Sequence, residues 1–211
     1  MNLQGKKINA MGDSITEGWG LASKEDSFQN VLGRMLGAAE VRSYGYGGTR
    51  LAKQIHGHDF GGAMPIRYVN MDDDADLILV MGGTNDYGHG DAPFGSWGDR
   101  SPDTFIGGCH TLFSGLIEKY PTACIVIMTP LQRSGGSQPS GNTGKPLIDY
   151  ADAIIRVAAE YSLPVLDMYR ASGICPEIPV QKELFIPDGI HPNEAGHRRM
   201  AERIAAFVTA L

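Results

Sequence analysis

Hydrophobic residues in this chain form short continuous runs that alternate with longer stretches of helical periodicity. The clearest runs are Leu77–Met81 and Cys124–Met128, which are typical of strands buried on both faces of a parallel sheet. Less regular runs predict three further strands at residues 7–11, 41–44 and 165–168. A sheet of five strands is therefore expected.

Between these runs, apolar residues recur every three or four positions and predict amphipathic helices. We expect helices at residues 28–36, 105–120 and 147–161, and a last one that begins near Pro192 and has Leu211 on its buried face. Strands that alternate with helices predict parallel strand–helix–strand units with helices on both faces of one sheet. The expected fold class is α/β.

Composition narrows the class of protein. The net charge of −6 disfavours nonspecific binding to nucleic acid or to an anionic membrane, and no stretch approaches the ~20 apolar residues of a membrane span. An odd number of cysteines without C-x-x-C spacing predicts free thiols at Cys109, Cys124 and Cys175. The apolar stretch after Lys7 is too short for a signal-peptide core, so we expect a single cytoplasmic domain over residues 1–211.

Four glycine-containing segments carry the candidate chemistry, and each follows a predicted strand. They are Gly-Asp-Ser-Ile-Thr-Glu-Gly (12–18), Gly-Tyr-Gly-Gly (45–48), Gly-Thr-Asn-Asp (83–86) and Asp-Gly-Ile-His-Pro (188–192). Because the carboxyl ends of parallel strands meet at one edge, where ligands bind, these segments are expected to share one pocket. Together they supply a serine, backbone N–H donors, an amide and an Asp/His pair, which suffices for acyl transfer.

Each segment also has a simpler structural interpretation. Ser14 can be a nucleophile on a strand-to-helix turn, but Ser14-x-x-Glu17 is also a capping-box pattern. Asp188 and His191 can be an orienting carboxylate and a base, or turn and cap residues before the last helix. Asn85 can donate to a developing oxyanion or stabilise its own turn. The serine lies outside the G-x-S-x-G elbow of α/β-hydrolases, which disfavours that family.

The four segments together resemble those of the SGNH (GDSL) hydrolase family of esterases and lipases, and the resemblance covers nearly the whole chain. It implies a flavodoxin-like three-layer α/β/α sandwich. It also implies Ser14 as nucleophile, His191 as base and Asp188 as the residue that orients the base. The oxyanion hole implied by the resemblance consists of the Ser14 N–H, the Gly48 N–H and the Asn85 side chain.

One departure from the family pattern concerns the second segment. Family members often carry an acidic residue after the glycine, whereas here Thr49 follows Gly48. Since Gly47 is adjacent, either glycine can be the N–H donor. The family acts on acetylated sugars, lysophospholipids, thioesters and aryl esters, so the resemblance does not name the ester.

Two long loops, residues 87–102 and 131–146, follow the third and fourth strands at the expected ligand edge. Loops of this length are functional more often than decorative, although both interpretations stay open. The candidate substrate-binding residues on or beside these loops are Tyr87, Trp97, Pro130 and Gln132.

The other polar residues are given no catalytic role. Residues 72–74 are interpreted as a solvated acidic run, and Asp13 and Asp86 as residues that hold their own turns. No metal or other cofactor is expected, because no metal-ligand spacing joins carboxylates to the remaining histidines, His56, His58, His89, His110 and His197.

The resulting hypothesis is a metal-independent carboxylic ester hydrolase that forms an acyl-Ser14 intermediate with a small-molecule ester. The absence of a long apolar lid favours short acyl chains, such as acetyl groups on a carbohydrate. The alternatives are a lysophospholipase or acyl-thioesterase of the same fold, a metallophosphoesterase, which lacks its D-x-H opening here, and a non-catalytic binding module. No nucleic-acid or membrane partner is expected, and the oligomeric state is not predicted.

Overall fold

A computed structural model describes residues 1–56 and 62–211 and contains a five-stranded parallel sheet in the order β2-β1-β3-β4-β5. The strands are β1 (Lys7–Gly12), β2 (Glu40–Gly45), β3 (Leu77–Met81), β4 (Cys124–Met128) and β5 (Val165–Leu166). The predicted five-stranded parallel sheet is confirmed, and β3 and β4 have the predicted bounds.

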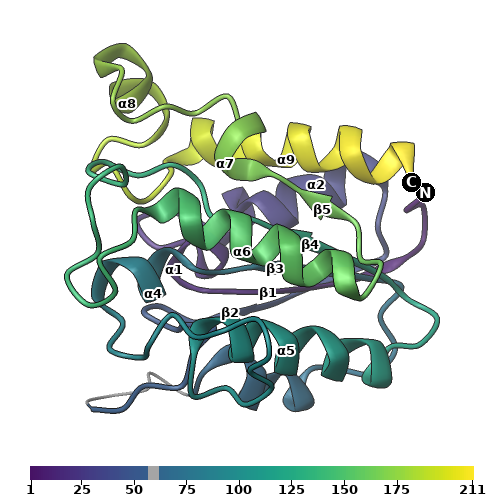
Figure 1. Ribbon diagram of the computed structural model, residues 1–211. Helices are drawn as coiled ribbons and strands as arrows, with labels where there is room; N and C mark the ends of the chain where they lie inside the picture. The colour runs from purple at the N-terminus through teal and green to yellow at the C-terminus, as the bar shows by residue number, and fades with distance from the viewer. Residues whose placement is uncertain (57–61) are drawn as a thin grey trace.

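Helices cover both faces of the sheet, as Figure 1 shows. On one face, α2 (Phe28–Leu36) packs against α9 (Glu194–Ala210). On the other face, α5 (Phe105–Lys119) packs against α6 (Leu147–Glu160). The three-layer α/β/α arrangement expected from the sequence is confirmed.

The central strand β3 supplies side chains to both hydrophobic cores. Leu77, Leu79 and Met81 belong to the core beneath α2 and α9, whereas Ile78 and Val80 belong to the core beneath α5 and α6. Successive side chains of a strand point to opposite faces, so a strand covered on both sides has to be apolar at every position.

The remaining helices are too short for their periodicity to be recognised in the sequence. Two of them, α1 and α4, directly follow β1 and β3 and lie at the carboxyl edge of the sheet, opposite the end at which the chain termini meet (Figure 1). The short elements are α1 (Ser14–Glu17), η1 (Lys24–Asp26), α3 (Met64–Arg67), η2 (Tyr68–Asn70), α4 (Thr84–His89), α7 (Met168–Ala171) and α8 (Pro179–Phe185).

The fifth strand is shorter than predicted, because a helix cap interrupts it. The Asp167 side chain accepts the backbone N–H of Arg170 at 3.2 Å, which starts α7 at Met168. An aspartate that caps a helix satisfies backbone donors that a strand would otherwise pair with its neighbour.

The last helix also differs from the prediction at both ends. It begins at Glu194 rather than near Pro192, because the Asn193 side chain caps it by accepting the Gly196 N–H at 3.0 Å. Leu211 lies beyond its last turn and is 53% exposed, so its predicted place on the buried face is wrong.

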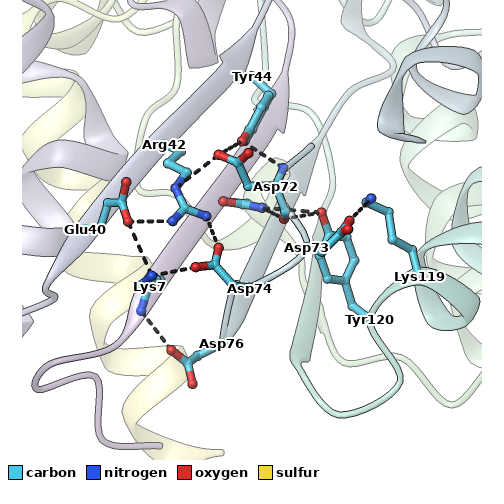
Figure 2. A network of polar contacts seen from close by, with 11 residues as sticks. Lys7, Glu40, Arg42, Tyr44, Asp72, Asp73, Asp74, Asp76, Lys119 and Tyr120 are labelled. Carbon is cyan, nitrogen blue, oxygen red and sulfur yellow. Dashed lines mark hydrogen bonds and ion pairs between the residues drawn. The ribbon is translucent and has the colours of Figure 1, made fainter. Parts of the chain in front are cut away.

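The acidic run at residues 72–74 belongs to a network of ion pairs along the edge strand β2 and the amino ends of its neighbours (Figure 2). Asp74 lies 2.5 Å from both Lys7 Nζ and Arg42 Nη1, and Asp73 pairs with Lys119. These carboxylates are exposed, as expected of a solvated run, but they have charged partners as well.

Two further expectations concern thiols and membranes. Cys109, Cys124 and Cys175 are free thiols, as predicted. Among the helices of residues 1–56 and 62–211, none combines the length and the apolar character that crossing a membrane requires.

Candidate active site

Ser14 is the first residue of α1 and follows β1 with only Asp13 between them. The Asp13 side chain accepts the Ile15 N–H at 3.0 Å and caps this helix. The capping-box interpretation of Ser14 is therefore wrong, because the cap is the preceding aspartate. As predicted, Asp13 holds its own turn, and the Ser14 hydroxyl remains available for other contacts.

The Ser14 hydroxyl contacts the histidine of the fourth segment. Ser14 Oγ lies 3.0 Å from His191 Nε2, and His191 Nδ1 lies 2.7 Å from Asp188 Oδ2. The second carboxylate oxygen of Asp188 accepts the backbone N–H groups of Ile190 and His191 at 2.8 and 2.7 Å. The predicted serine, histidine and aspartate thus form one hydrogen-bonded chain.

The Asp188 carboxylate fixes the tautomer of the imidazole. Burial opposes its ionisation, but the hydrogen bonds from the His191 N–H, the His191 ring and the Ile190 N–H outweigh burial and lower its pKa. A carboxylate accepts hydrogen bonds, so His191 Nδ1 carries the ring proton. Nε2 is then the acceptor that faces the Ser14 hydroxyl.

The second segment offers one glycine N–H to the site. The Gly47 N–H donates to Glu17 Oε2 at 2.8 Å and is therefore occupied. Among the described residues, nothing accepts the Gly48 N–H, and Gly48 lines the same cavity as Ser14 with a φ of +77° that favours glycine. Of the two alternatives left open by the sequence, this geometry favours Gly48.

Asn85 lies in the first turn of α4, where its side chain is held at both ends. Its Nδ2 donates to Thr49 O at 3.0 Å, and its Oδ1 lies 3.1 Å from His89 Nε2. The Arg50 guanidinium contacts His89 Nδ1 and can only donate, so the ring proton is on Nε2 and is donated to Asn85. Burial, together with the charges of Arg50 and Arg133, lowers the pKa of His89 and keeps it neutral.

These contacts orient the Asn85 amide. Its oxygen is engaged by His89 and one of its two N–H groups by Thr49, which leaves one N–H for the cavity. Its bond with His89 lies within α4, so Asn85 does help to hold its own helix. Its bond with Thr49 also joins α4 to the segment that follows the glycine turn.

Asp86 was predicted to hold its own turn, but its side chain holds a neighbouring segment instead. Its carboxylate accepts the N–H groups of Leu51 and Ala52 at 3.0 and 2.9 Å. Burial raises the pKa of Asp86 to about 6 and that of Asp13 to about 7. Ser14 and Asn85 therefore each have a buried carboxylate as their neighbour in the chain.

Arg67 and Gly45 fix the ends of the first two strands. Arg67 donates to Gly12 O and Tyr44 O, each at 2.6 Å, and burial lowers its pKa to about 10. A Cβ at Gly45 would lie 2.1 Å from the Glu17 backbone nitrogen, so α1 packs directly on the end of β2. The two turns are therefore in close contact.

The site opens into a cavity of about 340 Å³. The Trp19 ring lies 4.4 Å from the His191 ring and is 54% exposed at the rim. The lining residues are Ser14, Trp19, Gly47, Gly48, Asn85, His89, Arg133, Ile190 and His191.

Sequence reasoning gave no site role to four of these lining residues, of which Ile190 lies inside the fourth glycine-containing segment. His89 is four residues after Asn85, a spacing that places both on one face of a helix, although α4 is too short for its period to be recognised in the sequence. Trp19 follows the first segment directly, so its proximity to Ser14 could also have been inferred. Arg133 comes from the 131–146 loop, and no motif in the sequence points to it.

The four predicted substrate-binding residues do not line this cavity; they are Tyr87, Trp97, Pro130 and Gln132. Instead, Tyr87, Gln132 and Trp97 make contacts that hold the surrounding chain in place. The Tyr87 hydroxyl donates to Gly135 O at 2.7 Å, and Gln132 Nε2 donates to Tyr169 O at 3.0 Å. Trp97 stacks under the Arg156 guanidinium, 3.6 Å from the ring centroid, and Pro130 is buried.

The remaining histidines have unrelated environments. His56 is exposed near Asp91, His110 is bonded to the Tyr161 hydroxyl, and His197 accepts the Phe28 N–H at 3.1 Å. His58 lies outside the described residues. Within residues 1–56 and 62–211, no group of three or more histidine, cysteine, aspartate or glutamate side chains is placed to hold a metal ion.

Three known proteins are informative relatives of this chain. A multidomain esterase of Ruminococcus flavefaciens is 31% identical over 139 residues, which are 64% of this chain but 16% of that protein. A GDSL lipase of Mycobacterium tuberculosis is 26% identical over 213 residues, 96% of this chain and 81% of that protein. A solved structure from Lactobacillus plantarum is 32% identical, has a TM-score of 0.85 and covers 98% of each chain.

Residues 10–199 match the model of the GDSL-like lipase/acylhydrolase family. This range includes all four segments at the carboxyl edge, and the similarity to the solved structure extends over the whole sheet and both helical layers. The chain therefore belongs to the GDSL-like lipase/acylhydrolase family of carboxylic ester hydrolases.

Proposed function

We propose that this chain hydrolyses carboxylic esters through an acyl intermediate on Ser14. The observation that carries the proposal is the continuous contact from Ser14 Oγ to His191 Nε2, at 3.0 Å, and from His191 Nδ1 to Asp188 Oδ2, at 2.7 Å. A serine hydroxyl is a poor nucleophile alone, and a histidine base held by a carboxylate activates it.

In the acylation step, Ser14 Oγ attacks the acyl carbon while its proton moves to His191 Nε2. Negative charge then develops on the former carbonyl oxygen, where the N–H groups of Ser14, Gly48 and Asn85 can stabilise it. The tetrahedral intermediate formed in this way then collapses, and the bond between the acyl carbon and the alcohol oxygen breaks. The proton on His191 passes to the departing alkoxide, and the alcohol leaves.

Deacylation repeats the sequence with water as the nucleophile. His191 removes a proton from water, the resulting hydroxide attacks the acyl-Ser14 carbonyl, and the same three donors stabilise the oxyanion. The proton then returns to Ser14 Oγ as the carboxylic acid is released. Asp188 keeps Nδ1 protonated throughout, and its lowered pKa preserves its negative charge beside the imidazolium.

The proposed substrates are esters with short acyl chains, such as acetyl esters of a carbohydrate. The cavity of about 340 Å³ is small and contains the polar groups Asn85, His89 and Arg133. A long acyl chain needs an extended apolar wall, and the exposed Trp19 is the largest apolar side chain of this lining.

The proposal is tested with p-nitrophenyl acetate and longer p-nitrophenyl esters. We expect turnover to fall with acyl length and Ser14→Ala to lower kcat at least about a thousandfold. The matched control is Ser114→Ala, because Ser114 bonds to His110 O within α5, outside the cavity. Full turnover by the Ser14→Ala protein contradicts the mechanism.

Covalent labelling separates this proposal from the other reaction classes. A fluorophosphonate should modify Ser14, as located by mass spectrometry, and abolish turnover, whereas EDTA should leave it intact. Activity that resists the fluorophosphonate but disappears with EDTA would instead indicate a metallophosphoesterase-like site.

A further inference from the structure

Arg133 gives the cavity around Ser14 a positive charge that the proposed mechanism does not use. None of the nine lining residues is acidic, and Arg133 is the one strong base among them. The chain as a whole has a net charge of −6, so this local positive charge is opposite in sign to the net charge of the chain. Charge of one sign in a cleft attracts ligands of the other sign.

The guanidinium packs against one face of α4. Arg133 Nη1 donates to Thr84 O and Thr84 Oγ1 at 3.1 and 3.2 Å, and its Cζ lies 5.6 Å from the centroid of the Tyr87 ring. A Cβ at Gly88 would come within 2.6 Å of Nη1. Residues at positions i, i+3 and i+4 of the helix thus hold the side chain in place.

These contacts with α4 hold the Arg133 side chain in place but do not neutralise its charge. Among the described residues, no carboxylate forms an ion pair with its guanidinium, and the charges of Asp13 and Asp188 act on it only from a greater distance. Its Nε is buried without a hydrogen-bond partner, and Nη2 donates to no described atom. Burial lowers the pKa of Arg133, but an arginine side chain keeps its proton in proteins.

A half-buried cation with unused donors is costly to maintain unless a ligand supplies the counter-charge. A carboxylate fits this requirement, because it supplies one negative charge and its oxygens can accept the unused Nη2 donors. A phosphate group usually recruits several cationic or backbone donors, whereas one guanidinium with Nη1 already engaged offers fewer.

We propose that Arg133 binds a carboxylate carried by the ester substrate, so that the enzyme prefers esters of carboxylate-bearing molecules. The inference rests on the proposed ester hydrolysis and narrows its substrate class. The carboxylate can belong to the alcohol portion, as in an acetylated hydroxy acid or uronic acid, or to the acyl portion, as in a half-ester of a dicarboxylic acid.

Two matched pairs of esters distinguish these sources. For the alcohol portion, 4-acetoxybenzoate is compared with methyl 4-acetoxybenzoate, which has the same acetyl group and aromatic ring but no charge. For the acyl portion, monomethyl glutarate is compared with methyl pentanoate by pH-stat titration. We expect the wild-type protein to prefer the anionic member of at least one pair by ~10–100-fold in kcat/KM, the range for a hydrogen bond to a charged group.

Arg133→Met should abolish this preference, so that the two members of a pair have kcat/KM values within about threefold of each other. Arg34→Met removes the same charge from the exposed face of α2 and should leave the preference unchanged. Gly88→Ala retains the charge but displaces the guanidinium, so it should weaken the preference in the same direction. An Arg133→Met protein that loses both members of a pair equally overturns the proposal.

Binding to an inactive protein keeps this test separate from the proposed chemistry. In the Ser14→Ala background, calorimetry with 4-acetoxybenzoate and monomethyl glutarate should show binding of one of them that weakens at least about tenfold when Arg133→Met is added. If neither binding nor wild-type preference depends on Arg133, the inference fails although ester hydrolysis stands. If esters are bound in this way but Ser14 is dispensable for turnover, the mechanism fails instead.

Discussion

Aspartates at the two edges of the same sheet are stabilised in opposite ways. At the carboxyl edge, Asp13 and Asp86 are buried and accept backbone N–H groups, and burial raises their pKa values to about 7 and about 6. Along the amino edge, Asp74 is exposed, and hydrogen bonds from Arg42 and Lys7 lower its pKa below the ordinary range (Figure 2).

This difference agrees with the proposed location of the active site at the carboxyl edge. The amino edge uses charge pairs in water, which contribute little each and tolerate substitution. The carboxyl edge keeps polar groups away from water and fixes their direction, which lowers stability but prepares donors for a developing charge. Substitutions at the carboxyl edge should therefore change rate and pH dependence, and substitutions at the amino edge should change neither.

The largest expected effect is on the amide of the carboxyl edge. Asn85→Ala removes the N–H that faces the cavity and should lower kcat ~100–1,000-fold with KM changed less than about threefold. The control is Asn30→Ala, whose amide bonds to Lys24 O on the exposed side of α2. Unchanged kcat in the Asn85 variant would remove this residue from the oxyanion hole.

The next effect concerns the pH dependence of stability. The folded-state pKa of Asp13, about 7, is above its unfolded value, so the folded chain holds a proton that the unfolded chain has released. The contribution of Asp13 to the free energy of unfolding should therefore decrease by roughly 1 kcal/mol per pH unit from about pH 5 towards pH 7, and level off above pH 8.

Asp13→Asn retains a side-chain oxygen for the Ile15 N–H but cannot ionise. Chemical denaturation of both proteins between pH 5 and 8 measures the contribution of Asp13 together with its electrostatic coupling to Asp86, whose charge helps to raise the pKa of Asp13. Parallel curves for the two proteins would mean that Asp13 does not titrate in this window.

A smaller effect is expected from the histidine that orients Asn85. His89→Ala frees the amide to rotate and should lower kcat by about fivefold to tenfold, as expected for one lost hydrogen bond. His56→Ala is the matched control, since His56 is exposed. In the Asn85→Ala background the His89 substitution should have no further effect on kcat, and additive losses would show that His89 acts by another route.

The smallest effect is expected at the amino edge. Asp74→Asn breaks the pairs with Lys7 and Arg42. Because Asp74 is exposed and both bases still pair with Glu40, the free energy of unfolding should fall only slightly. The loss should shrink in high salt, and kcat should not change. A large effect on kcat would mean that the two edges are coupled.

The sequence predicted the parts of the fold that depend on continuous apolar patterns. β3 and β4 have their predicted bounds because every position of these strands is buried or nearly so. β5 is shorter than predicted because Asp167 caps the helix that follows it. A capping hydrogen bond does not change the pattern of hydrophobic residues from which the strand was predicted. Helices of one or two turns, such as α4, are shorter than the window that reveals their period.

Side chains in the candidate site were predictable where a motif carried them. Ser14, Asn85, Asp188 and His191 lie within the glycine-containing segments, and the structure brings them to one edge. The place of Arg133 in the site was not predictable, because this residue lies on a long loop and its side-chain position depends on contacts with α4. The side-chain directions of loop residues such as Tyr87 depend on partners far along the chain, which local sequence does not specify.

The hydrogen bond from the Gly47 N–H to Glu17 links two turns that are far apart in the sequence. An engineer who wishes to widen the cavity cannot treat them as independent modules, because loosening the first turn would release a second donor beside Gly48. Libraries that vary residues 17 and 47 together should therefore yield more working enzymes than libraries that vary either position alone.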